Sequence, residues 1–147
     1  MYTSSTLYVI DASVAIKWFS HVNEADIEQA LKLQELHLWK ECLLIAPDIL
    51  VYEIINALRY NPNFEQDDTN LALLSLLKME LELIKPDEDL LKRAIKLAYN
   101  KDTTIYDASY IALAQKKGCL LITADGKFFT KIQDLPQAIL LKDLSLE

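Results

Sequence analysis

The sequence contains very little glycine. Gly118 and Gly126 are the only glycines among its 147 residues. The glycine-rich turn of dinucleotide-binding folds, the P-loop of nucleoside triphosphatases and the G-x-S-x-G turn of serine hydrolases each need two or more glycines at fixed spacing. All three motifs are absent. The sequence therefore lacks the usual signatures of dinucleotide-dependent enzymes, P-loop phosphoryl transferases and serine hydrolases.

Cysteine and histidine are equally scarce. Cys42 and Cys119 are isolated and form no C-x-x-C pair, and His21 and His37 lie in different segments. This distribution gives no spacing typical of a zinc site. We interpret both cysteines as reduced, buried side chains, although the sequence leaves a disulfide between them open.

Long hydrophobic runs and excess positive charge are also missing. No apolar run approaches the ~20 residues of a membrane span, and the first residues lack the basic and apolar regions of a signal peptide, so we expect a cytoplasmic protein. Twenty-two acids against fifteen bases give a net charge of −7. This balance argues against a protein that coats nucleic acid non-specifically. An enzyme that recruits metal cations and binds nucleic acid through a small basic patch remains possible.

The sequence is rich in hydrophobic residues, which make up 52% of the chain, while charged residues make up 25%. These values are typical of a globular domain. Five short apolar runs alternate with longer segments of helical spacing, and we predict strands at 7–10, 43–46, 81–84, 120–123 and 138–141. No linker or repeat divides the chain. The pattern predicts a single α/β domain over residues 1–147 with a mostly parallel sheet.

Local signals place the helix ends. We predict helices over 49–60, 67–79, 87–100 and from about 103 to 117. Asp48 and Asp102 are candidate N-caps, and Gly118 follows two lysines as a helix C-terminal signal. The helix at 67–79 is apolar around nearly its whole circumference. Such a helix is either buried between the core and neighbouring helices or lies in a subunit interface.

Four carboxylates are expected at one edge of the sheet. Asp11 and Asp125 follow predicted strands, whereas Glu53 and Asp107 lie about one turn into predicted helices. In a parallel α/β fold, the carboxyl ends of the strands and the N-termini of the crossover helices share one edge, where ligands bind. Asp107 and Glu53 share helix faces with apolar residues and with no basic residue. A bound cation is therefore an economical partner for these acids.

Each acid also has a simpler explanation. Asp107 fits the third position of a capping box begun by Thr104, Asp11 fits a helix cap, Asp125 with Gly126 fits a turn, and Glu53 fits a solvated helix acid. These explanations require four independent coincidences at the same edge. We therefore favour a joint oxygen-ligand site for Mg²⁺ or Mn²⁺.

Four segments of the chain, in order and at matching spacing, resemble the PIN-domain ribonucleases, specifically the VapC-type toxins of toxin–antitoxin pairs. These segments are YVIDASV at 8–14, PDILVYE at 47–53, TIYDASYIALA at 104–114 and LITAD at 121–125. A lone D-x-S is a weak motif, but the segment around Asp107 combined with T-x-D is specific. The resemblance extends over nearly the whole chain.

The resemblance implies a three-layer α/β/α PIN-like fold with a five-stranded sheet and a Mg²⁺- or Mn²⁺-dependent endoribonuclease site. By this resemblance, the catalytic and metal-ligating acids of the family correspond to Asp11, Glu53, Asp107 and Asp125 of this chain. The supporting hydroxyls of the family correspond to Ser13 and Thr123. Expected products carry a 5′-phosphate and a 3′-hydroxyl. The resemblance further implies a homodimer and inhibition by a cognate antitoxin protein.

Several residues near the predicted rim are candidates for contact with RNA, with Lys17 the strongest because it closes the first turn after Asp11. The full set is Lys17, Trp18, Arg59, Lys101, Lys127 and Lys131. Solvated charge, or a core position for the aromatic ring, is the alternative for each.

Other functions fit the sequence less well. A haloacid-dehalogenase-type phosphatase needs a second acid where Ser13 stands, and a phospho-receiver domain needs neighbouring acids after its first strand. A catalytically silent PIN-like module that binds RNA or protein remains as an alternative of a different class.

Overall fold

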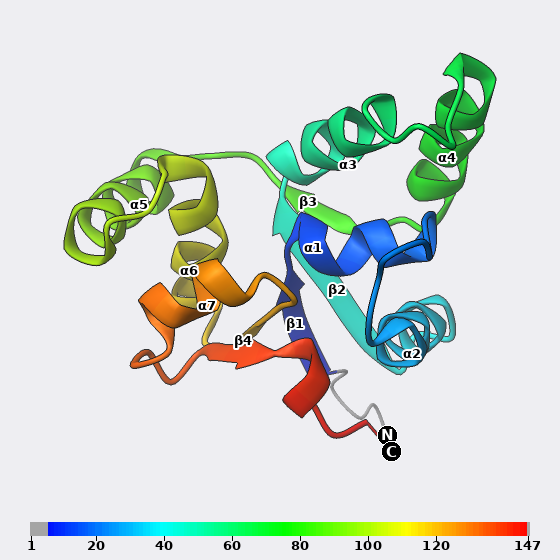
Figure 1. The fold of residues 1–147 in the computed structure, drawn as a ribbon. Helices are drawn as coiled ribbons and strands as arrows, with labels where there is room; N and C mark the ends of the chain where they lie inside the picture. The colour runs from blue at the N-terminus through cyan, green and yellow to red at the C-terminus, as the bar shows by residue number, and fades with distance from the viewer. Residues whose placement is uncertain (1–5, 147) are drawn as a thin grey trace.

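The computed structural model describes residues 6–146, which form a five-stranded sheet between two layers of helices (Figure 1). The strands are β1 Thr6–Ile10, β2 Cys42–Pro47, β3 Glu82–Ile84, β4 Leu120–Thr123 and β5 Ala138–Leu140. Their order across the sheet is β3-β2-β1-β4-β5, and all four pairings are parallel. The predicted parallel α/β architecture is thus confirmed.

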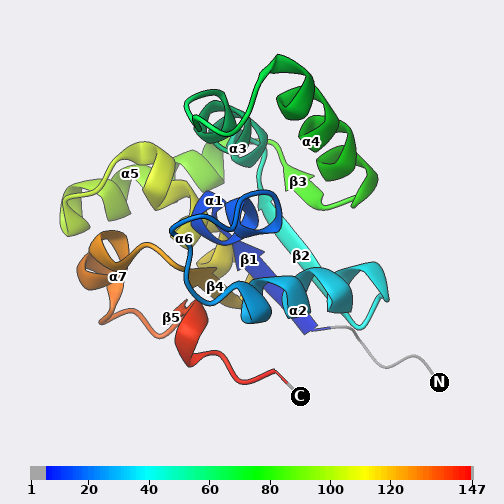
Figure 2. The same ribbon diagram turned by 45° about the vertical axis from the view of Figure 1, so that its right-hand side comes forward.

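Two groups of helices cover the two faces of the sheet, and the direction in which the chain crosses from strand to strand sets the face on which each helix lies. The first group is α1 Ala12–Ala15, α2 Ile27–Leu38, α3 Ile49–Arg59 and α4 Gln66–Lys78; the second is α5 Glu88–Lys101, α6 Ile105–Lys117 and α7 Gly126–Ile132. Right-handed crossovers place helices on one face when the chain moves from β1 to β3, and on the other when it moves from β3 to β5. Figures 1 and 2 show these two groups on opposite sides of β1. The three-layer prediction is confirmed.

The centre of the sheet is apolar on both faces. Val9 and Ile10 of β1 are fully buried, as are Leu121 and Ile122 of β4, although successive residues of a strand point to opposite faces. Strands with this pattern belong to parallel sheets that are covered on both sides. Within residues 6–146, no helix is both long enough and apolar enough to cross a membrane.

The helix that is buried almost all round is α6, not α4 as one sequence interpretation has it. Residues 110–114 of α6 are at most 1% exposed, because α6 packs between the sheet and α5. On α4, by contrast, Leu71, Leu74 and Leu77 are 66%, 54% and 53% exposed. Burial of α4 on more than one side is therefore wrong for the isolated chain.

The start of α6 also differs from the expectation. Asp102 is not an N-cap: it ends α5 in the left-handed conformation, with φ at 53°. Thr104 caps α6 instead, and its Oγ1 accepts a hydrogen bond from the Asp107 amide at 3.0 Å. Gly118 ends α6 with φ at 65°, as its sequence position predicts.

The two cysteines are not bonded to each other. Both are free thiols, with Cys42 buried and Cys119 partly buried. Burial raises the pKa of Cys42 to about 11, so its thiol stays protonated at neutral pH. The interpretation as reduced thiols holds in this structure.

Candidate active site

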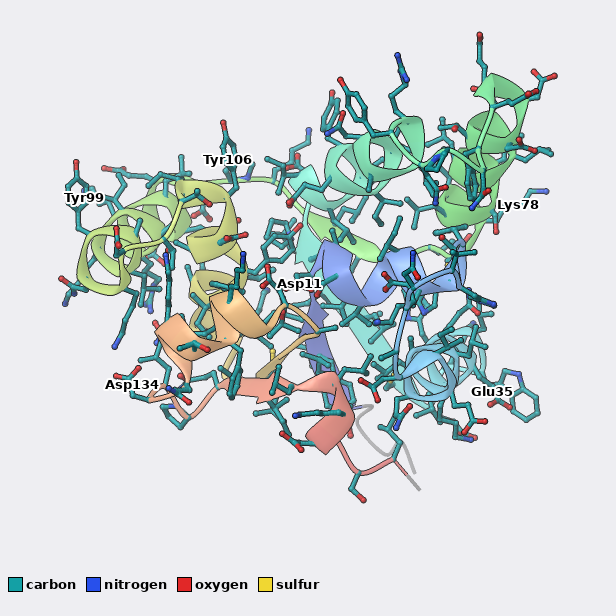
Figure 3. The ribbon with its side chains drawn as sticks, in the orientation of Figure 1. Asp11, Glu35, Lys78, Tyr99, Tyr106 and Asp134 are labelled. Carbon is teal, nitrogen blue, oxygen red and sulfur yellow. The ribbon has the colours of Figure 1, made fainter. Side chains whose placement is uncertain are left out.

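Successive strands are added to the sheet on one side of β1 as far as β3, and then on its other side from β4 onward, so the topological switch point lies between β1 and β4. From β1 the chain continues into α1 on one face of the sheet, and after β4 it continues into α7 on the other face. Ligands of open α/β sheets bind in the crevice at such a switch point, beyond the carboxyl ends of the strands. Asp11 follows β1 directly and Asp125 follows β4 two residues later. Figure 3 shows Asp11 near the middle of the molecule, where β1 meets α1.

Four acids from four different elements line one open cavity of about 290 Å³ at this point. Glu53 enters from α3 and Asp107 from the first turn of α6, beside Asp11 and Asp125. The remaining lining residues are Ala12, Ser13, Ile16, Ala57 and Tyr110. The structure therefore brings the four predicted carboxylates to a shared space, and none of the described residues that line it is basic. We call this space the acid cavity.

Hydroxyl and amide groups hold the buried carboxylate of Asp11, which is 6% exposed. The Ser13 amide donates to Asp11 Oδ1 at 3.1 Å, and the Ser13 and Thr123 hydroxyls donate to Oδ1 and Oδ2. Ser13 Oγ also accepts from the Ala124 amide at 2.8 Å, which ties the start of α1 to the end of β4. Both predicted supporting hydroxyls thus contact Asp11.

The pKa of Asp11 is raised from 3.8 to about 6. Burial is the main cause, since a charged carboxylate loses its hydration, and the nearby charge of Asp125 raises the pKa further. Hydrogen bonds from Ser13 and Thr123 oppose this change because they stabilise the ionised form. The effect of burial thus outweighs the hydrogen bonds, and ionisation of Asp11 is less favourable in the folded protein than in water.

Glu53 is oriented by Tyr110, a residue that the sequence does not predict as part of the site. Tyr110 is 1% exposed, and its hydroxyl donates to Glu53 Oε1 at 2.6 Å. Burial raises the pKa of Glu53, the Tyr110 hydrogen bond lowers it, and the charge of Asp107 raises it again. The available signal was the position of Tyr110 three residues after Asp107 on the same helix face.

The carboxylate of Asp125 caps a helix as well as lining the cavity, whereas Asp107 contributes its backbone amide to the cap of α6. Asp125 Oδ1 accepts from the Phe128 amide at 3.1 Å and caps α7. Burial raises the pKa of Asp107, with a further rise from Asp125 and an opposing effect from Lys131. Capping and clustering are therefore compatible roles for Asp125.

The donor set of the acid cavity suits a hard divalent cation. Within residues 6–146, no three histidine, cysteine, aspartate or glutamate side chains lie close enough together to form a ready metal cage. Mg²⁺ commonly keeps several waters and takes one or two carboxylates, so it does not require such a cage. The lining offers carboxylate and hydroxyl oxygens but no histidine or cysteine, which fits Mg²⁺ or Mn²⁺ better than zinc.

Lys17, the strongest sequence candidate for contact with RNA, does not line the acid cavity. It is 5% exposed, and its ammonium group binds Glu24 Oε1 at 2.9 Å and the Ala25 carbonyl at 2.6 Å. Contact with an RNA phosphate would require this buried ion pair to break. Trp18 is likewise a core residue, with its indole N–H donating to the Ala30 carbonyl at 2.8 Å.

Comparison with known proteins agrees with the fold. The sequence model of the PIN domain matches residues 8–135. The chain belongs to the PIN-domain family.

Among its relatives is Ribonuclease VapC3 of Pyrobaculum aerophilum, which is 30% identical over 133 residues, covering 86% of this chain and 95% of the relative. Exonuclease VapC9 of the same organism is 27% identical over 124 residues, covering 84% of each chain. A chain of a toxin–antitoxin complex from Klebsiella pneumoniae superposes with a TM-score of 0.66 at 17% identity, over 95% of this chain and all of that chain. At that identity, the structural match establishes the fold alone.

Proposed function

We propose that this protein is a metal-dependent endoribonuclease that hydrolyses RNA phosphodiesters in the acid cavity. The observation that carries the proposal is the meeting of Asp11, Glu53, Asp107 and Asp125 in one cavity without a basic side chain. The VapC ribonuclease relative supports RNA as the substrate class. The relative described as an exonuclease leaves the direction of attack to be tested.

Asp11 and Asp107 are the central ligands in this proposal, with Glu53 and Asp125 acting directly or through water. When bound, Mg²⁺ or Mn²⁺ would offset the charge of the phosphodiester, polarise a phosphoryl oxygen as a Lewis acid and favour deprotonation of the attacking water. Burial is the main cause of the raised pKa values of Asp11, Glu53 and Asp107. A cation bound in the cavity would offset the negative charge that burial makes costly, and the raised pKa values therefore support a role for it.

Supporting side chains fix the direction of each carboxylate. Ser13 and Thr123 donate to both oxygens of Asp11, and Tyr110 donates to one oxygen of Glu53. The Phe128 amide holds Asp125 Oδ1. Hydrogen bonds of this kind orient ligand oxygens before the substrate arrives, and their loss typically reduces metal affinity or activity.

A circular RNA separates endonuclease from exonuclease activity, because it has no ends. We expect the purified protein with Mg²⁺ or Mn²⁺ to open a mixed pool of circular RNAs, giving 5′-phosphate and 3′-hydroxyl ends, and to leave it intact in chelator. Cleavage of linear RNA alone would indicate an exonuclease. Metal-independent binding with no cleavage of either RNA would favour the silent binding module.

We also propose that the protein is the toxin of a toxin–antitoxin pair, acts as a homodimer and is inhibited by a cognate antitoxin. The structural match to a chain of a toxin–antitoxin complex supports this role. The exposed leucines of α4 supply apolar surface of the kind that protein partners cover.

A further inference from the structure

A second cavity adjoins the acid cavity between the start of α6 and α7. Its volume is about 330 Å³, and it shares Asp107 and Asp125 with the acid cavity. Its other lining residues are Asp102, Thr103, Thr104, Lys127, Phe128 and Lys131. We call it the lysine cavity. A ligand that occupies both cavities must pass directly over the two shared acids.

The two lysines lie four residues apart on α7 and therefore on the same side of that helix. Lys131 donates to the Asp102 carbonyl at 2.6 Å, which is a neutral acceptor. Within residues 6–146, neither Lys127 nor Lys131 forms a salt bridge with a carboxylate, whereas Lys101 binds Asp134 at 2.5 Å. Neither ammonium group is held in a salt bridge there, although the charge of Lys131 does act on Asp107 and lowers its pKa.

The other candidates for RNA contact are engaged elsewhere. Lys17 and Trp18 are buried with internal partners, and Lys101 holds Asp134. Arg59 stacks on the Tyr60 ring at 5.1 Å and lines a separate cavity between α3 and α4. Of the six candidates, Lys127 and Lys131 alone line a cavity that is continuous with the acids.

Hydroxyl groups complete the lining. Thr104 Oγ1 accepts from the Asp107 amide at 3.0 Å, so its own O–H can still donate to an oxygen in the cavity. Two ammonium groups and a hydroxyl donor match the anionic oxygens of a phosphodiester. Because an RNA strand must approach a protein with a net charge of −7, such a local positive group is what its backbone requires.

We propose that the lysine cavity binds the backbone phosphate that neighbours the scissile phosphate of RNA. Lys127 contacts this phosphate, and Lys131 contacts it while also holding the loop that carries Thr104. The inference rests on the proposed RNA hydrolysis and adds a substrate-positioning site that is separate from the metal ligands.

The test measures binding of a fluorescein-labelled 12-nucleotide single-stranded RNA to the full chain with Mg²⁺, in an Asp11→Asn background to prevent cleavage. Lys127→Gln/Lys131→Gln is compared with Lys92→Gln/Lys96→Gln, a pair with the same spacing and charge change on the exposed side of α5. We expect the α7 pair to weaken binding about tenfold and to lower the salt-dependence slope by about 0.7 for each lost phosphate contact. The α5 pair should change neither value appreciably.

Lys127→Gln alone guards against a folding artefact, since the side chain of Lys127 forms no hydrogen bond or ion pair with any other residue in the described range 6–146. Lys127→Arg should retain the affinity. With cleavage restored, the α7 pair should raise KM more than it lowers kcat. Unchanged affinity in both Lys127→Gln and the α7 pair, with RNA still cleaved by wild type, would overturn this inference and leave the proposed function standing. Absence of both RNA binding and cleavage in wild type would overturn both.

Discussion

The carboxylate of Asp11 performs two tasks in the fold. It caps α1 through the Ser13 amide, and it contributes a buried negative charge to the acid cavity. The same combination occurs at Asp125, which caps α7. A helix start next to a strand end is a place where one carboxylate can do both, since the amides there stabilise negative charge.

The raised pKa of Asp11 predicts how the free energy of unfolding depends on pH in the absence of metal. Its folded pKa of about 6 lies above the value of 3.8 expected for the unfolded chain. The unfolded carboxyl therefore loses its proton first, so this group destabilises the fold progressively from about pH 4 to about pH 6 and constantly above that. A shift of two units corresponds to at most about 3 kcal/mol.

Urea unfolding in chelator checks this prediction with Asp11→Asn. The free energy of unfolding of the variant minus that of wild type should become more positive between pH 4.5 and pH 7. Taking the difference cancels the titration of the other acids, and Asp67→Asn on the exposed start of α4 serves as a control. A difference that is flat or falls with pH would contradict the assignment of a raised pKa.

Tyr110→Phe tests whether the hydrogen bond to Glu53 positions a ligand oxygen. Removing the hydroxyl leaves the half-buried carboxylate of Glu53 without its donor, so we expect about tenfold weaker Mn²⁺ binding in calorimetry. Tyr106→Phe on the exposed side of the same helix is the matched control. Equal Mn²⁺ affinity in both variants and wild type would mean that Tyr110 has a packing role alone.

At this scale, the sequence predicts residues that end strands or begin helices, since those positions follow from local pattern. Asp11 and Asp125 are of this kind. The Tyr110–Glu53 contact joins residues 57 positions apart and depends on how α3 and α6 pack, which no local pattern contains. The Lys17–Glu24 ion pair could not be predicted either, because Glu24 lies in a loop without a periodic pattern.

At the scale of elements, hydrophobicity suggests that α4 is the buried helix, but the structure buries α6 and leaves one face of α4 exposed. The sequence of α4 contains more leucine, yet α6 is the central helix because its small alanines let it approach the sheet and α5 closely. Burial depends on where the crossover from β3 to β4 places a helix, and this is set by topology. Composition alone therefore misassigns the two helices.

The exposed face of α4 leads to a prediction about assembly. Light scattering at micromolar concentration should give a dimeric mass for wild type and a monomeric mass for Leu71→Glu/Leu74→Glu. Because both side chains are more than half exposed, the free energy of unfolding of the isolated chain should change by no more than about 0.5 kcal/mol. A monomeric wild type would contradict the interface hypothesis. As a control, Leu76→Ala removes a buried side chain of the same helix, so it should destabilise the fold but leave the mass dimeric.

At the scale of the whole molecule, the alternation of strands and helices predicts the parallel sheet and the layers. The strand order β3-β2-β1-β4-β5 does not follow from alternation, because several right-handed arrangements satisfy it. That order places Asp11 beside Asp125 at the switch point and lets α3 and α6 bring their acids to the same edge. The four acids could be predicted as a group, whereas Lys127 and Lys131 could be predicted only as two of six candidates near the rim, because their shared cavity depends on how α6 and α7 pack.

The most direct test of the central claim is cleavage of a mixed RNA pool by wild type, Asp11→Asn and Asp107→Asn, with Mg²⁺, Mn²⁺ or chelator. Glu88→Gln, an exposed acid on α5, controls for loss of charge. The predicted result is metal-dependent cleavage by wild type and Glu88→Gln, with a loss of at least about a hundredfold in both active-site variants. Equal cleavage by all four proteins would contradict the assignment of the acid cavity as the active site.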